Sequence, residues 1–99
     1  MAYKKFEQLI SYDCAVSKEA AKLKGFESEV AGDVDVLLAP NIHAGNFMGK
    51  MLTCTCGARM AGCIVGGKCP VVLTSRASSA DEKYLSIVVA AAVSSGKGI

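Results

Sequence analysis

Between positions 70 and 83, an apolar run of strand character leads directly into the start of a helix. The β-branched residues of 70–74 predict a short buried strand. Ser79 followed three residues later by Glu82 forms a capping box, which predicts a helix over about 80–94, ended by a glycine. A strand joined to a helix by so short a loop is typical of the α/β class.

The rest of the chain predicts the same alternation of strands and helices. The expected elements are a helix at 17–24, a strand at 33–40, a helix at 42–61 and two short strands at 63–65 and 70–74. The link between the last two strands is too short for a parallel crossover, so we expect antiparallel pairing there. We therefore predict a single α/β domain over residues 1–99, with a mixed sheet and flanking helices.

Composition excludes several classes of protein. The 52% of hydrophobic residues argues against disorder. The longest strongly apolar run, 85–93, is about half of the ~20 residues that span a bilayer, and no secretory signal is visible. The net charge of +2 comes from scattered lysines with few aromatics, which does not fit nucleic-acid binding. We expect a cytoplasmic protein that contacts neither membrane nor nucleic acid.

A line of small residues recurs every fourth position in the predicted helix at 42–61. Its members are Gly45, Gly49, Thr53, Gly57 and Ala61. Glycine in a helix interior costs up to ~1 kcal/mol, so we expect another backbone to approach this line closely. That neighbour belongs either to the same domain or to a partner subunit, and the sequence favours neither.

Five cysteines raise the alternative of a metal or redox site. They are Cys14, Cys54, Cys56, Cys63 and Cys69, with His43 as the only histidine. Structural zinc sites are typically built from Cys-x-x-Cys pairs in loops. Two cysteines spaced by two residues in a predicted helix point apart, so buried, apolar cysteine is the favoured interpretation. We expect no bound metal.

Ser75 and Arg76 are the candidate binding residues, because they lie between a predicted strand end and a helix start. Ligands of open α/β sheets bind at this edge, a helix N-terminus attracts anions, and arginine grips phosphate with two donors. Asp81 and Glu82 either complete the helix cap or supply a catalytic carboxylate. A phosphate-loop match at 62–68 is dismissed, since no helix pattern follows it.

Three stretches of the sequence form a specific combination of motifs. They are residues 28–46 (SEVAGDVDVLLAPNIHAGN), 58–62 (ARMAG) and 70–77 (PVVLTSRA). Together they resemble the C-terminal part of phosphate acetyl/butyryltransferases, with the butyryl type the closer match. The resemblance covers about 12–94, whereas residues 1–11 look like the very start of such an enzyme.

The resemblance implies acyl transfer between acyl-CoA (butyryl- or acetyl-CoA) and inorganic phosphate, giving acyl phosphate and CoA. Coenzyme A is then a substrate, and no cofactor is permanently bound. It implies a part of the fold of isocitrate and isopropylmalate dehydrogenases, in homo-oligomers. Ser75 and Arg76 would contact the phosphate or the acyl carbonyl, and Glu82 or Asp81 would accept the thiol proton of coenzyme A.

Family chains are about three times as long as this one, so most of the first domain is absent. We therefore expect a truncated family member with weak or no activity of its own. The alternative is a non-catalytic assembly module derived from the family, suggested by the line of small residues and the high apolar content.

Overall fold

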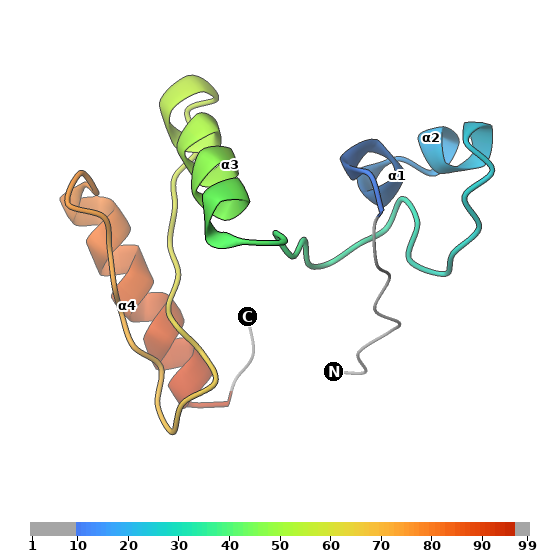
Figure 1. Ribbon diagram of the computed structural model, residues 1–99. Coiled ribbons are helices and arrows are strands. Elements are labelled where there is room, and N and C mark those ends of the chain that lie inside the picture. Colours follow the sequence, from blue (N-terminus) through green and yellow to red (C-terminus); the bar gives the residue numbers. More distant parts are fainter. Residues whose placement is uncertain (1–9, 97–99) are drawn as a thin grey trace. The chain divides into compact units, whose positions relative to one another are not determined.

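The computed structural model describes residues 10–96, and the chain divides after Ala39 into two compact units. The first unit contains α1 (Tyr12–Val16) and α2 (Lys18–Leu23). The second contains α3 (Ile42–Thr55) and α4 (Ala80–Ser94), as labelled in Figure 1. Each unit is described separately below.

The N-terminal unit encloses a small core of short side chains. Cys14, Ala15 and Ala21 are the buried residues of α1 and α2, and the Cys14 side chain is only 2% exposed. The chain returns over this core at Gly32, whose N–H donates to the Cys14 carbonyl at 2.8 Å. Gly32 has a φ of +74°, and a Cβ there would collide with the backbone of Lys18. Only glycine satisfies both conditions.

The predicted helix at 17–24 is confirmed as α2, together with both of its ends. The Ser17 hydroxyl accepts from the Ala20 N–H at 3.2 Å and caps the first turn. At the other end, Gly25 has a φ of +65°, and the Phe26 N–H donates to the Ala21 carbonyl at 2.9 Å. This left-handed stop satisfies carbonyls that the last turn would leave unpaired.

In the C-terminal unit, the segment that follows α3 runs beside α4 in the same direction (Figure 1). The Met60 N–H donates to Glu82 and the Gly62 N–H donates to Ser86, each at 3.2 Å. Ser86 is 3% exposed and its hydroxyl also donates to the Glu82 carbonyl at 2.8 Å, so this buried polar group is fully paired. The segment is thus fixed by polar contacts.

The helix predicted at 42–61 begins as expected but ends earlier, at Thr55. The Asn41 side chain caps it by accepting from the Ala44 N–H at 3.0 Å. Gly57 then adopts a φ of +68°, which directs the chain out of the helix. Gly57 therefore serves as a helix stop.

Only Gly45, Gly49 and Thr53 of the line of small residues lie within α3. At Gly49 an added Cβ would lie 2.8 Å from the terminal methyl of Met60. The close neighbour at this position therefore comes from the same chain and is a side chain, not the backbone that we expected.

The predicted α/β class with its mixed sheet is wrong for the part of the chain that the structure describes, where the regular elements are all helices. Between residues 10 and 96, the one β-type pairing is an isolated antiparallel bridge of Ile64 with Val71, whose N–H···O distances are 2.8 and 3.1 Å. Its antiparallel sense was expected. The segment predicted as a strand at 33–40 is irregular and its Leu38 is exposed. A strand forms only when a neighbour pairs its N–H and C=O groups, and among residues 10–96 the stretch 34–40 takes part in no β-type pairing.

Large apolar side chains lie mainly on the surface of both units. In the C-terminal unit, Ala90 is the one apolar residue classed as buried among those described, while Phe47, Leu73 and Ile87 are all exposed. None of the helices within residues 10–96 combines the length and the apolar character that crossing a membrane requires.

Candidate functional site

Ser75 and Arg76 lie in the loop that enters α4, as the sequence predicted. The loop is held by a turn in which the Ser78 N–H donates to the Ser75 carbonyl at 3.0 Å. The Ala77 N–H also approaches the Ser75 hydroxyl oxygen at 3.4 Å. Both candidate side chains are exposed, and within residues 10–96 the Arg76 guanidinium forms no ion pair. They are therefore accessible to a ligand.

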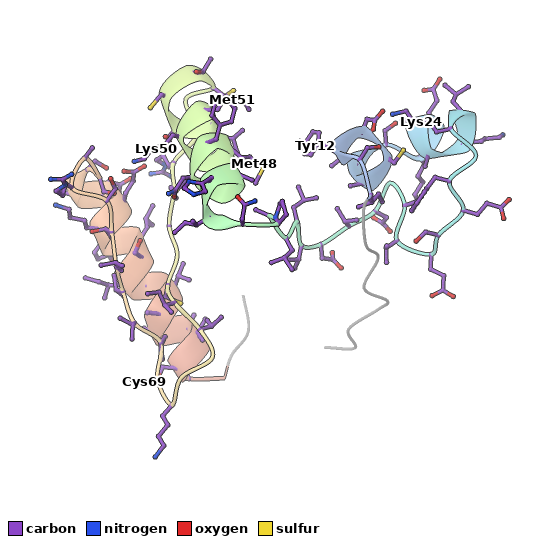
Figure 2. The ribbon with its side chains drawn as sticks, viewed as in Figure 1. Tyr12, Lys24, Met48, Lys50, Met51 and Cys69 are labelled. Carbon is purple, nitrogen blue, oxygen red and sulfur yellow. The ribbon has the colours of Figure 1, made fainter. Side chains whose placement is uncertain are left out.

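Lys50 also belongs to this site, although the sequence analysis did not single it out. It extends from α3 (Figure 2). Its ammonium group donates to the Ser75 hydroxyl oxygen at 3.0 Å. Within the described residues α3 and α4 do not pack directly against each other. The contact joins positions twenty-five residues apart, so no local motif predicts it. The one sequence feature that could have drawn attention to Lys50 is that it is the only lysine or arginine in α3.

Both carboxylate oxygens of Glu82 accept backbone N–H groups, one of them at the N-terminal cap of α4. One oxygen accepts from the Ser79 N–H at 3.0 Å, and the other accepts from the Met60 N–H at 3.2 Å. The Ser79 hydroxyl accepts from the Glu82 N–H in return, which completes the predicted capping box. The hydrogen bonds from the N–H groups of Ser79 and Met60, with a smaller contribution from the charge of Lys50, hold the pKa of Glu82 below its ordinary value.

Asp81 forms an exposed ion pair with Arg59, with an Nη1–Oδ2 distance of 2.6 Å. The two carboxylates considered for catalysis are therefore both engaged with groups of this chain. The cap of α4 is filled by its own side chains rather than left open for an anion. The accessible donors lie one turn earlier in the chain, at Ser75 and Arg76.

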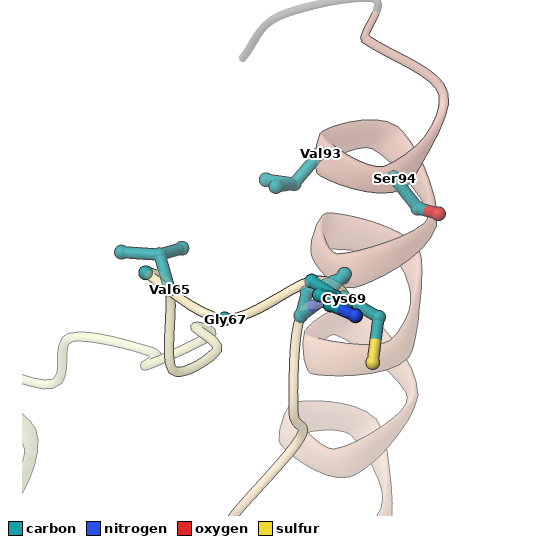
Figure 3. Close-up of a pocket in the computed structure, with 8 residues that line it drawn as sticks. Val65, Gly67, Cys69, Val93 and Ser94 are labelled. Atoms are coloured by element: carbon teal, nitrogen blue, oxygen red, sulfur yellow. The ribbon is translucent and has the colours of Figure 1, made fainter.

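Two hollows lie in the C-terminal unit, one away from the site and one beside Lys50. One, of about 210 Å³, lies where the turn at 66–69 meets Val93 and Ser94 near the end of α4 (Figure 3). This turn includes the end of the phosphate-loop match, and the next helix begins only at Ala80, so the dismissal of that motif is confirmed. The second is an open groove of about 480 Å³ along α3, bordered by Phe47, Met51 and Lys50 among others.

The cysteines do not gather into a cluster in the described part of the chain. Cys54, Cys56 and Cys69 are exposed, Cys63 is half-buried, and all are free thiols. Over residues 10–96, no group of three or more histidine, cysteine or acidic side chains is placed to hold a metal ion. The expectation that cysteine acts as a buried apolar residue holds for Cys14 but is wrong for the three exposed thiols.

Comparison with known proteins gives a consistent match over most of the chain. The family model described as phosphate acetyl/butaryl transferase matches residues 8–91. The phosphate butyryltransferase of Clostridium acetobutylicum is 49% identical over 88 residues, covering 89% of this chain and 29% of the relative. The phosphate acetyltransferase of Thermotoga maritima is 51% identical over 79 residues, covering 80% of this chain and 27% of the relative. The chain thus spans less than a third of the length of these relatives.

Proposed function

The chain belongs to the phosphate acetyl/butyryl transferase family, and from this premise we propose that it carries part of a site for acyl transfer between acyl-CoA and inorganic phosphate. The products are an acyl phosphate and free CoA, with butyryl- or acetyl-CoA as the acyl donor. The observation that carries the proposal is the pair Ser75–Arg76, exposed at the entrance to α4 within the region of the family match.

In this reaction a phosphate oxygen attacks the thioester carbonyl, a C–O bond forms and the C–S bond breaks. Negative charge develops on the carbonyl oxygen in the tetrahedral intermediate. We assign to Arg76 the stabilisation of this charge or of the phosphate, because a fixed cationic donor near a developing oxyanion is the most effective electrostatic aid. Ser75 supplies a hydroxyl donor beside it.

In the reverse direction a base must take the thiol proton of CoA. That Glu82 or Asp81 is this base stays a prediction. Such a base works best when its pKa approaches neutrality. The lowered pKa of Glu82 makes it a weak base in this arrangement. For Glu82 to act, its carboxylate must first leave the N–H groups of Ser79 and Met60.

We further propose that residues 1–99 by themselves turn over weakly or not at all. The matched relatives contain more than three times the aligned length, so the remaining walls of a shared site lie outside this sequence. A homo-oligomer and a cytoplasmic location stay predictions alongside this one.

The test is phosphate-dependent loss of butyryl-CoA or acetyl-CoA, followed by thioester absorbance so that the free thiols do not interfere. We expect any turnover to fall by about a hundredfold in Arg76→Ala, since removal of one charge-stabilising donor costs about that factor. Lys68→Met, which removes one positive charge from the turn at 66–69, serves as the matched control and should retain the rate. Turnover equal in both variants would contradict the role of Arg76. No turnover at all is the other outcome expected of residues 1–99 alone, and the role of Arg76 is then tested by the loss of phosphate binding in Arg76→Ala.

A further inference from the structure

The contact between Lys50 and Ser75 determines which hydrogen-bonding groups this site offers. The Ser75 hydroxyl oxygen accepts from the Lys50 ammonium at 3.0 Å and from the Ala77 N–H at 3.4 Å. A hydroxyl has two acceptor lone pairs and one donor proton. With both lone pairs engaged, the proton is the group that Ser75 has left for a ligand.

Lys50, like Ser75, has only hydrogen-bond donors left to offer a ligand. An ammonium group has three N–H donors and no acceptor, and the contact with Ser75 uses one of them. Two donors therefore remain on Lys50. The neighbouring Arg76 adds a planar set of donors that also lacks any acceptor.

The two carboxylates at the start of α4 are engaged in contacts of their own. Both oxygens of Glu82 accept backbone N–H groups, and Asp81 is paired with Arg59. Within the described residues Lys50 forms no ion pair with either carboxylate, so two ammonium donors of Lys50 and the Ser75 proton are left for a ligand, with Arg76 as the next residue in the chain. A tetrahedral oxyanion with several acceptor oxygens is the ligand class that matches these donors.

We infer that Lys50 is a phosphate-binding residue, which donates to a phosphate oxygen while it turns the hydroxyl proton of Ser75 toward the same anion. This inference rests on the proposed function and adds to it a residue from a different helix. Lys50 also explains how the long helix α3 takes part in a site that the sequence places entirely at the start of α4. The role is binding and positioning, with no bond made or broken at Lys50.

The experiment titrates inorganic phosphate into the ¹⁵N-labelled 99-residue chain at constant ionic strength, with the amide signals of Ser75 and Ala77 as the readout. Lys50→Met should weaken phosphate binding by about ten- to a hundredfold, as expected for loss of a charged hydrogen bond. Lys50→Arg should restore most of the affinity, because it keeps charge and donors. Lys68→Met is the control for net charge and should change the affinity by less than about twofold.

A second measurement needs no substitution and so does not depend on how a variant folds. The Lys50 side-chain ¹³Cε signal of the unaltered chain should move with the same midpoint as the Ser75 amide. An unmoved Lys50 signal, equal weakening in Lys50→Met and Lys68→Met, or no saturable phosphate response in the unaltered chain would each overturn the inference.

The inference and the proposed function fail in different ways. Phosphate binding that depends on Lys50, without any butyryl-CoA turnover, would count against the transferase activity alone. Suppose that turnover is lost in Arg76→Ala while Lys50→Met leaves the KM for phosphate unchanged. This result would count against Lys50 alone. A rise in the KM for butyryl-CoA with no change for phosphate would likewise overturn the inference, because it would place Lys50 at the acyl-CoA side.

Discussion

Each of the two units is stabilised internally by a different kind of contact. In the N-terminal unit, short side chains of α1 and α2 are buried and the backbone closes over them at Gly32. In the C-terminal unit, the contacts that fix the segment after α3 are polar and converge on Glu82 and Ser86 of α4. The N-terminal unit depends on how well its small side chains fill the core. The C-terminal unit depends on the pairing of hydrogen-bond donors with acceptors.

This difference matters for function because the candidate site lies in the polar unit. Apolar packing is non-directional, whereas hydrogen bonds fix direction and weaken steeply when misaligned. A site that must aim Ser75 and Lys50 at one anion benefits from the directional kind of contact. The comparison also predicts that volume changes disturb one unit and that lost donors or acceptors disturb the other.

The largest expected effect comes from overfilling the apolar core. Ala21→Leu adds volume at a residue that is 3% exposed, between α1 and α2. Overpacking of this kind costs about 1–3 kcal/mol. Amide hydrogen exchange should accelerate over residues 11–32 and stay unchanged in α4. Equal acceleration in both units would break the comparison.

A smaller effect is expected when the buried hydroxyl of the polar unit is removed. Ser86→Ala leaves the Gly62 N–H without its acceptor, and because Gly62 is exposed the loss is that of an ordinary hydrogen bond, about 0.5–1.5 kcal/mol. Exchange of the Gly62 and Met60 amides should then accelerate. The matched control is Ser95→Ala, whose exposed hydroxyl bonds only to the Ala92 carbonyl. A loss of stability as large in Ser95→Ala would contradict the assignment.

The smallest expected effect separates two carboxylates by their response to acid and salt. The Lys24 ammonium, 2.6 Å from Asp13, is the main cause that holds the pKa of Asp13 well below its ordinary value. The pKa of Glu82 is lowered mainly by backbone N–H groups. Both pKa values are depressed by folding, so both contacts stabilise the fold above the ordinary pKa and lose this effect as the pH falls through the folded value.

Salt should distinguish the two groups, because it screens exposed ion pairs over a Debye length of about 3 Å at about 1 M. In carboxyl ¹³C titrations, added salt should move the pKa of Asp13 toward 3.8 and leave that of Glu82 nearly unchanged. The Glu82→Gln variant should show no acid-dependent loss of protection at Met60. An equal salt response of both carboxyls would show that charge pairing governs both units.

The features predicted correctly from sequence are those that a few neighbouring residues determine. The cap at Ser17, the stop at Gly25 and the capping box of Ser79 with Glu82 are all found where the sequence places them. Each joins groups within one or two helical turns, so the pattern of side chains is sufficient. The position of Ser75 and Arg76 before α4 follows directly from the same cap.

The features missed or predicted wrongly depend on partners that are distant along the chain. A strand at 33–40 has the right side chains, but strand pairing is a property of two segments, and none of the described residues pairs with 34–40 in β fashion. The end of α3 was misplaced because the line of small residues continues through Gly57 to Ala61 at helical spacing, while the left-handed conformation of Gly57 decides the boundary. The link from Lys50 to Ser75 spans twenty-five residues and has no local signature.

The burial of Cys14 gives the N-terminal unit a built-in kinetic reporter. Cys14 is buried in α1, whereas the cysteines of the other unit are exposed or half-buried. An alkylating reagent therefore modifies four thiols at rates set by their own reactivity. The fifth reacts only as often as the enclosing helices separate. The rate of that last modification measures, in one unaltered molecule, how frequently the small core opens to water.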